Sequence, residues 1–127
     1  MSTNDPQATV QAFFDRLTEG GHLKDAIDEH LSDDCVWENS GLPAATGKDA
    51  IHEQMQNFID GMGLHALVVD THAIAVAGNT VLTEREDHID QADGTRVLSM
   101  TMAGTFQVTD GKITRWADYF DPRPLLP

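Results

Sequence analysis

The residues of this chain that are best placed to do chemistry are Arg85 and Asp87, which lie two apart in the run VLTERED of residues 81–87. In a β-strand, side chains two apart leave the same face, so this cation and this carboxylate share a face with the apolar Val81 and Ile89. A charged pair on an apolar face costs free energy unless it is paired and hydrogen-bonded. An active site is one explanation for such a pair.

A second carboxylate, Asp118, is expected on the last strand between two large rings. The same alternation places Trp116, Asp118 and Phe120 on one face. Removal from water between these rings would raise the pKa of the Asp118 carboxyl and suit it to general acid or base catalysis. In an earlier strand, Trp37 and Asn39 share a face and offer an indole N–H and a neutral amide.

Two carboxylates with an arginine between them can divide the work of proton transfer. One of Asp87 and Asp118 stays ionised and removes a proton from water, while the other stays protonated and donates its proton. Arg85 can hold both carboxylates, although it does not readily give up its own proton. This chemistry suits a neutral, mostly apolar molecule and needs no metal or other cofactor. The competing interpretation is a structural ion pair of Arg85 and Asp87, with Asp118 solvated at a strand end.

The elements that must position these side chains are helices first and strands afterwards. Apolar residues at helical spacing predict helices over residues 5–19, 22–31 and 48–61. Asp5 followed by Pro6 is a typical helix start. Strands are predicted over residues 35–39, 64–77, 80–90, 95–109 and 112–121, with hairpin turns at 78–79, 91–94 and 110–111.

This order of elements predicts an α+β fold. The N-terminal helices would pack on a curved, mixed but mostly antiparallel sheet. Bending of the long strands, for example at Gly104, would leave a cone with an internal cavity. The length of 127 residues suits a single domain, residues 1–127.

Charge and cysteine content restrict the partners and the compartment. The net charge of −13 argues against nucleic acid and anionic membrane surfaces as partners, because the long-range field repels them. The single Cys35 cannot form an internal disulfide, which fits a reducing cytoplasm. Residues 1–6 have neither the basic nor the apolar character of a signal peptide, and no apolar run approaches the roughly 18 residues that span a bilayer. We therefore expect a cytoplasmic protein.

The histidines do not indicate a metal site. The chain has six, and their spacing matches no pattern of metal ligands. We expect no metal to be bound. Cys35 lacks a histidine neighbour that would activate it, so we do not expect it to be a nucleophile.

Longer stretches of the chain resemble a known family. Residues 81–87 and 104–121, together with Asn39, Leu42-Pro43 and the run 47–50, resemble the limonene-1,2-epoxide hydrolase family. This family belongs to the nuclear transport factor 2-like and ketosteroid isomerase-like cone fold. The likeness covers nearly the whole chain, with the same order of helices and strands.

The resemblance implies one-step hydrolysis of an epoxide by water, without a covalent enzyme ester. Asp118 would be the base that activates water, Asp87 the acid that protonates the epoxide oxygen, Arg85 the bridge between them, and Asn39 a holder of the water. It further implies a homodimer. The residues that fall where the family lines its pocket are Phe58, Met62, Ile89, Met100, Met102 and Phe120, to which the strand pattern adds Trp116.

One position departs from the family. Where its members usually have a tyrosine that holds the water, this chain has Trp37. An indole donates one hydrogen bond and accepts none, whereas a phenol does both. Trp37, Asn39 and Asp118 could still hold the water. With Trp37 pointing inward, we expect a changed orientation of the water and a smaller or flatter substrate.

Two other functions remain compatible with the same fold. An isomerase or cyclase acting on a ketone would need a tyrosine or protonated acid as oxyanion donor, and Tyr119 points away from the face of Asp118. A non-catalytic ligand-binding or dimerisation domain is the other alternative, because a fold alone does not determine function. It would be favoured if Arg85 and Asp87 formed a pair with no access from water to Asp118.

Overall fold

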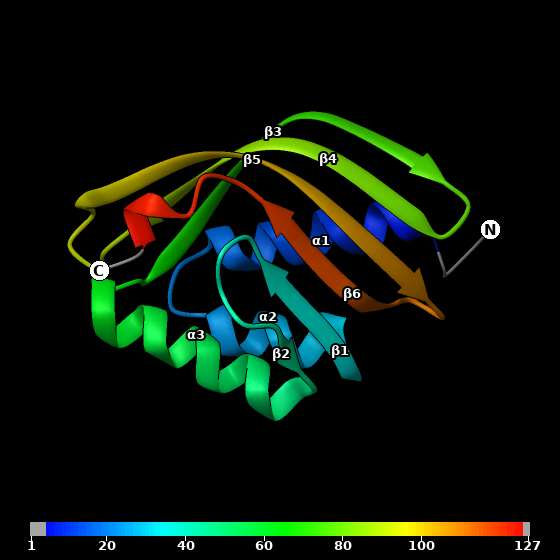
Figure 1. The fold of residues 1–127 in the computed structure, drawn as a ribbon, viewed down its shortest axis with the longest axis horizontal. Helices are drawn as coiled ribbons and strands as arrows, with labels where there is room; N and C mark the ends of the chain where they lie inside the picture. The colour runs from blue at the N-terminus through cyan, green and yellow to red at the C-terminus, as the bar shows by residue number, and fades with distance from the viewer. Residues whose placement is uncertain (1–4, 126–127) are drawn as a thin grey trace.

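A curved sheet of six strands arches over the helices in the computed structural model, which describes residues 5–125 (Figure 1). Residues 1–4 and 126–127, at the two ends of the chain, lie outside the described part. The helices are α1 (Pro6–Thr18), α2 (Leu23–His30) and α3 (Lys48–Met62), and a short 3₁₀ helix, η1 (Arg123–Leu125), follows the last strand. The strands are β1 (Leu31–Asn39), β2 (Ala45–Thr46), β3 (Ala66–Ala77), β4 (Thr80–Asp90), β5 (Arg96–Thr109) and β6 (Lys112–Tyr119). The predicted α+β class is confirmed.

The order of the strands in the sheet is β2-β1-β6-β5-β4-β3. Every neighbouring pair is antiparallel except β1 and β6, which run parallel, so the sheet is mixed as expected. The parallel pair joins strands that are far apart in the sequence. It brings Trp37 beside Trp116 and Asn39 beside Asp118. The site residues of the first and last strands therefore lie next to one another.

The ends of the helices follow local sequence signals. The Asp5 side chain caps α1 by accepting hydrogen bonds from the backbone N–H groups of Gln7 and Ala8, at 3.1 and 3.3 Å. Helix α3 ends at Met62 and is capped by Gly63, whose φ of 68° is a left-handed conformation that glycine adopts without strain. The face that α1 turns to the sheet is fully apolar and buries Val10, Phe13, Phe14 and Leu17.

The boundaries of the first and last strands differ from the prediction, and one short strand was not predicted. Strand β1 starts at Leu31 rather than at residue 35, because the chain leaves α2 directly into the sheet and a register irregularity follows Leu31. Strand β2 was not predicted, since two residues carry too little pattern. Strand β6 ends at Tyr119, so Phe120 and Asp121 lie just beyond it.

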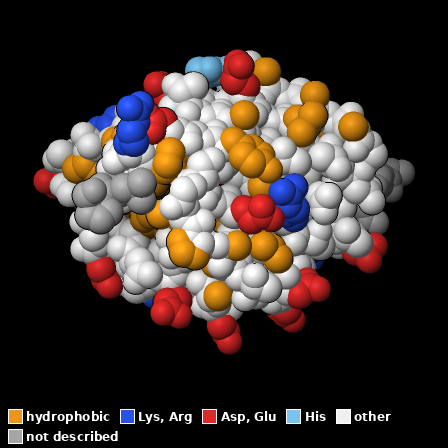
Figure 2. All heavy atoms as spheres, viewed as in Figure 1, with side chains coloured by type: hydrophobic (Ala, Val, Ile, Leu, Met, Phe, Trp, Pro, Cys, Tyr) orange, Lys and Arg blue, Asp and Glu red, His pale blue; other side chains and the backbone are white. Residues whose placement is uncertain are grey.

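The outer face of strand β4 is largely solvated, with one exception. Acidic side chains project around the rim of the face drawn in Figure 2, and hydrophobic side chains are interspersed with polar ones over its middle. Glu84 is exposed, as the alternation along β4 predicts, but His88 on the same face is 5 % exposed. Side chains of the neighbouring strands pack around it, so the expectation of a wholly solvated face was wrong at this position. No helix within residues 5–125 is long and apolar enough to cross a membrane.

Candidate active site

The Arg85 guanidinium lies between the two carboxylates on the concave side of the sheet. Arg85 Nε and Nη2 donate hydrogen bonds to Asp87 Oδ1 and Oδ2, at 3.0 and 2.8 Å. Nη2 also donates to Asp118 Oδ1 at 3.0 Å. All three side chains are at most 5 % exposed. The ion pair of Arg85 and Asp87 is therefore part of a larger cluster, and Asp118 is not solvated as the structural alternative required.

Other side chains fix the guanidinium from behind. Arg85 Nη1 donates to Thr83 Oγ1 at 2.9 Å, and that hydroxyl donates to the backbone oxygen of Gly104 at 3.2 Å. The guanidinium carbon lies 5.0 Å from the centre of the Phe14 ring and 5.7 Å from that of Phe106. Such contacts with ring faces stabilise a desolvated cation. Although burial by itself lowers the pKa of Arg85, the carboxylates of Asp118 and Asp87 raise it above its ordinary value, so the arginine stays charged.

Asp118 is the carboxylate whose proton affinity the site changes most clearly. Burial, together with the nearby Asp87, raises the pKa of Asp118 from 3.8 to about 6, against the opposing effects of Arg85 and Trp116. Trp116 Nε1 donates to Asp118 Oδ2 at 2.9 Å. Each Asp118 oxygen thus receives one hydrogen bond from a fixed donor. A carboxylate in this state can accept a proton near neutral pH.

Strand β1 brings two more polar groups to Asp118. The Trp37 ring stacks on Trp116 with centroids 4.2 Å apart and planes 12° from parallel. Its Nε1 is buried and has no hydrogen-bond partner among residues 5–125. Asn39 lies beside Asp118 in the parallel register. A buried donor without a partner is costly, which makes this N–H a place for an oxygen atom that enters the cavity.

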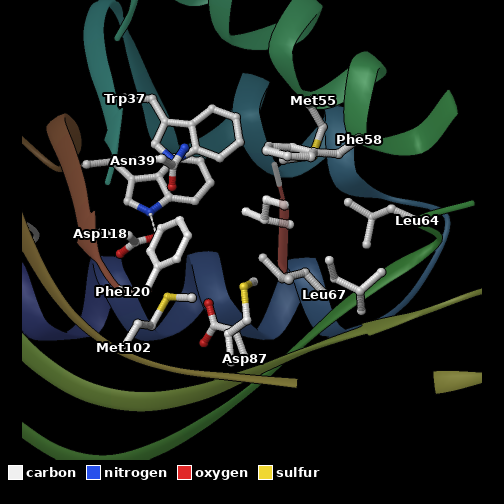
Figure 3. Close-up of a pocket in the computed structure, with 14 residues that line it drawn as sticks. Trp37, Asn39, Met55, Phe58, Leu64, Leu67, Asp87, Met102, Asp118 and Phe120 are labelled. Atoms are coloured by element: carbon white, nitrogen blue, oxygen red, sulfur yellow. Dashed lines mark hydrogen bonds between the residues drawn. The ribbon is translucent and has the colours of Figure 1, made fainter. Parts of the chain in front are cut away.

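These groups open into a cavity with a free volume of about 40 Å³. Figure 3 shows Trp37, Asn39 and Asp118 toward one end, with Leu64 and Leu67 at the other. Its walls are mostly apolar and comprise Trp37, Asn39, Met55, Phe58, Leu64, Leu67, Asp87, Ile89, Met100, Met102, Trp116, Asp118, Phe120 and Leu125. The cavity thus combines a charged floor with a hydrophobic body, as small-molecule sites do.

All the predicted pocket residues line this cavity except Met62. Met62 instead lines a separate surface groove with Gln91 and Pro124, because it stands at the very end of α3, where the helix has passed the cavity. Four lining residues were not predicted from the sequence: Met55, Leu64, Leu67 and Leu125. Met55 carried a signal, because it shares the inward stripe of α3 with Phe58. Leu125 carried none, because the 3₁₀ helix that holds it has no repeating pattern.

Gly104 is a further residue whose role the sequence did not reveal. A side chain at this position would begin 2.6 Å from Asp118 Oδ1 and 3.0 Å from Thr83 Oγ1, and it would collide with Arg85 Nη1. Gly104 pairs with Thr83 on one side and Asp118 on the other. The glycine therefore leaves the space in which arginine and carboxylate meet.

Cys35 and the histidines lie away from this chemistry. Cys35 is fully buried, and burial raises the pKa of its thiol to about 12, so it is not a ready nucleophile. Within residues 5–125, one group of side chains has the spacing to hold a metal ion: Asp70, Glu86 and His88. It lies on the opposite face of β4 from Arg85.

Comparisons with known proteins identify the family of this chain. The family model of the limonene-1,2-epoxide hydrolase catalytic domain matches residues 4–127. The chain is 34 % identical over 112 residues to the epoxide hydrolase EphG of Mycobacterium tuberculosis, covering 88 % of this chain and 70 % of that protein. The chain belongs to the limonene-1,2-epoxide hydrolase family. It is an epoxide hydrolase.

Solved structures extend the comparison to the fold of this epoxide hydrolase. An LEH-like epoxide hydrolase of M. tuberculosis superposes with a TM-score of 0.75 at 33 % identity, covering 93 % of this chain and 84 % of that one. A SnoaL-like protein from Jannaschia sp. has a TM-score of 0.74 at 16 % identity, covering 94 % and 88 % of the two chains. An NTF2-like protein from Cytophaga hutchinsonii has a TM-score of 0.72 at 19 % identity, covering 94 % and 93 %. The last two likenesses establish the NTF2-like cone fold, as expected from the sequence.

Proposed function

We propose that this enzyme adds water to a small hydrophobic epoxide and releases a vicinal diol in one step. General acid and base catalysis would suffice, without a covalent intermediate and without a cofactor, in a single domain of residues 1–127. The observation that carries the proposal is the buried Arg85 held between Asp87 and Asp118 at the floor of an apolar cavity.

Asp118 acts as the base in this proposal. With a pKa of about 6 it is mostly ionised at neutral pH, yet it binds a proton more readily than an ordinary carboxylate. It removes a proton from water while the water oxygen attacks an oxirane carbon. The adjacent Asn39 supports this assignment, because its amide can hold the same water.

Asp87 acts as the acid. It lines the cavity, and it donates its proton to the oxirane oxygen as the carbon–oxygen bond breaks. Arg85 links the two carboxyl groups by donating a hydrogen bond to each. After one turnover Asp118 holds the proton from water and Asp87 is ionised. The proton returns to Asp87 before the next cycle.

Trp37 orients the water in this proposal. Its unpartnered Nε1 can only donate, so it engages one lone pair of the water. The water must then donate its two protons to Asp118 and to the carbonyl oxygen of Asn39. Its second lone pair is left for the oxirane carbon. A donor-only tryptophan thus allows one orientation of the water, whereas a tyrosine allows several.

The rest of the cavity selects the substrate. The predicted wall residues, Phe58, Ile89, Met100, Met102, Trp116 and Phe120, offer rings, thioethers and aliphatic carbon to the substrate. The free volume of the cavity is about 40 Å³, well below the usual range of roughly 300–1,000 Å³ for ligand sites. Both features favour a compact hydrocarbon epoxide over a long or charged one.

A single-turnover experiment in ¹⁸O-labelled water tests the proposal. With enzyme in excess over a panel of cyclic and styrene-type epoxides, direct attack of water puts ¹⁸O into the diol in the first turnover. Attack by a carboxylate would instead put an unlabelled enzyme oxygen into that first diol. Unlabelled product would rule out the one-step mechanism, and no diol above background with any epoxide of the panel would rule out the proposed substrate class.

We also propose that the enzyme acts as a homodimer in the cytoplasm. The family resemblance supports the dimer, as do four exposed hydrophobic side chains on strands, Val76, Leu82, Val97 and Tyr119. The single free Cys35 is compatible with a reducing compartment. Light scattering of the purified protein should give twice the mass of the chain, 13.9 kDa, and a monomer mass would refute the dimer.

A further inference from the structure

Three strands bring a second cluster of polar side chains together on the outer face of the sheet. Asp70 on β3 pairs directly with Glu86 on β4, and His88 on β4 pairs with Ser99 on β5. Glu86 and His88 are two apart, so they leave the same face of their strand. This face is opposite to the one that carries Arg85 and Asp87. The cluster therefore lies outside the proposed active site.

The ligand atoms of this cluster converge on one nitrogen. His88 Nε2 lies 2.8 Å from Asp70 Oδ2 and 3.4 Å from Glu86 Oε1. One nitrogen and two carboxylate oxygens from these residues lie within 4.8 Å of one another. Three ligands held by a tetrahedral ion at about 2.0–2.1 Å would be separated by about 3.3 Å. The Asp70 side chain is 58 % exposed, so it has room to rotate toward that spacing.

The charges of the cluster call for a cation. Carboxylates directly opposite each other on neighbouring strands repel, and Asp70 and Glu86 form such a pair. Arg96, a cation on the neighbouring strand β5, is engaged by Asp90, with Nε 2.8 Å from Asp90 Oδ1. His88 supplies the nitrogen on which both carboxylates converge. A divalent ion between the three groups would neutralise both carboxylates.

The imidazole is also held as metal-binding histidines are. His88 Nδ1 lies 2.6 Å from Ser99 Oγ, and the His88 side chain is 6 % exposed. A hydrogen bond to the far ring nitrogen fixes the ring orientation and directs Nε2 at the ion. The two carboxylates are the accessible side, with 58 % and 40 % of the Asp70 and Glu86 side chains exposed. An ion can therefore enter from solvent and keep water in its remaining positions.

We propose that Asp70, Glu86 and His88 bind a divalent transition-metal ion of the zinc class on the outer face of the sheet. One imidazole nitrogen with carboxylate oxygens is a ligand set that suits zinc and its neighbours, whereas magnesium prefers oxygen alone. The site does not depend on epoxide hydrolysis, because β4 separates it from the cavity. It joins β3 to β4 by a link that the backbone hydrogen bonds do not provide.

Calorimetric titration of the chelator-treated full chain with zinc chloride tests the proposal, and cobalt absorption reports the geometry. We expect one ion per chain, and at least tenfold weaker binding in Asp70→Asn, Glu86→Gln and His88→Gln. Ser99→Ala should weaken binding about 10–100-fold if it orients the ring. His52→Gln is the matched control, because His52 has the single carboxylate Asp28 at 2.7 Å and should not affect binding.

The same variants separate this proposal from the proposed function. Asp70→Asn and Glu86→Gln should keep full epoxide hydrolysis, since neither residue lines the cavity, so loss of metal with retained activity is the expected result. Absence of saturable zinc binding in the parent chain would overturn the site. So would binding that survives both carboxylate substitutions, or binding that His52→Gln removes. His88→Gln is not needed for the decision if it fails to fold.

Discussion

Strand β4 carries two charged clusters on its two faces, and they differ mainly in their access to water. On the inner face, Arg85 and Asp87 are 1 % and 2 % exposed. On the outer face, Glu86 and its cross-strand neighbour Asp70 have 40 % and 58 % of their side chains exposed. Both faces combine two carboxylates with one nitrogen group. The alternation of one strand thus places carboxylates in two different dielectric environments.

The difference shows what burial contributes to chemistry. Inside, low solvent screening strengthens every interaction of Arg85, and the loss of hydration on burial raises the pKa of Asp118 to about 6. Outside, water and salt screen the carboxylates, and such pairs contribute about 0–1 kcal/mol. The inner cluster can therefore hold a proton in readiness near neutral pH. The outer one can exchange its partners with solvent.

The largest expected effect of the inner cluster is at Asp118. Asp118→Asn keeps the shape of the side chain but removes the base, so we expect turnover of an accepted epoxide to fall about 10²–10⁴-fold. The fold should persist, because Asn still accepts from Arg85. Rates measured by diol formation, with circular dichroism as the check on folding, would decide this. A variant with more than a tenth of the parent rate would mean that Asp118 is not the base.

Gly104→Ala should break the inner cluster without removing any charge. The new methyl group collides with Arg85 and approaches Asp118 Oδ1 to 2.6 Å, so the two must move apart. We expect a loss of activity of about 10²-fold and a loss of about 1–3 kcal/mol in the free energy of unfolding. Ala103→Val, which adds atoms on the neighbouring exposed position, is the control. If both substitutions had equal effects, the space that Gly104 leaves for Arg85 and Asp118 would not be what the activity requires.

The pH dependence of hydrolysis should report the buried carboxylate. Because the pKa of Asp118 is raised to about 6, lowering the pH through 6 protonates the base, and kcat/KM should fall about tenfold per pH unit below it. An ordinary aspartate would keep its activity to about pH 4. Rates from pH 4 to 8, corrected for acid-catalysed opening of the epoxide in buffer, would distinguish the two.

The same pKa has a consequence for stability. The folded state binds the Asp118 proton more tightly than the unfolded chain does, so folding is favoured below about pH 4. That contribution is lost as the pH rises from about 4 to about 6. Asp118→Asn should remove this loss and leave the variant as stable as the parent chain, or more stable, at pH 8. If the variant were several kcal/mol less stable than the parent chain at pH 8, the ionised Asp118 carboxylate would not be destabilising.

Much of the fold and part of the site follow from local patterns in the sequence. Alternation along β4 assigned Arg85 and Asp87 to the inner face, and helical spacing gave the three helices. The pairing of β1 with β6 could not be predicted in this way, because parallel neighbours distant in the chain leave no local signal. That pairing is what brings Asn39 beside Asp118.

The features of the site that could not be predicted from the sequence are those that depend on distances between strands. Gly104 was interpreted as a point of bending, and its contact with Arg85 depends on the register of β4 and β5. The outer cluster was missed for the same reason, since Asp70 and His88 are far apart in sequence and meet only across a strand pair. Met62 was wrongly included in the pocket wall, because helical spacing does not tell where a helix passes the end of a cavity.

Trp37→Phe tests whether the Trp37 N–H binds the reacting water or whether the ring only packs in the cavity wall. The substitution keeps a ring against Trp116 and removes the unpartnered donor. We expect kcat to fall about tenfold, as for loss of one hydrogen bond of about 1.4 kcal/mol, with KM little changed. Trp37→Tyr restores a hydroxyl and should recover part of kcat. Equal rates for Phe and Tyr, or a change in KM alone, would assign Trp37 to packing.

Asp70→Asn should have the smallest effect, and for that reason it sharpens the comparison. The residue lies 2.8 Å from His88 Nε2, a contact as short as that of Arg85 with Asp87. Distance alone would therefore predict similar losses on both faces of β4. Because the Asp70 side chain is 58 % exposed, we expect less than 1 kcal/mol of lost stability in chelator-treated protein and a change in kcat of less than twofold. The loss should shrink further in 1 M salt. A larger loss that salt does not reduce would mean that burial is not what separates the two clusters.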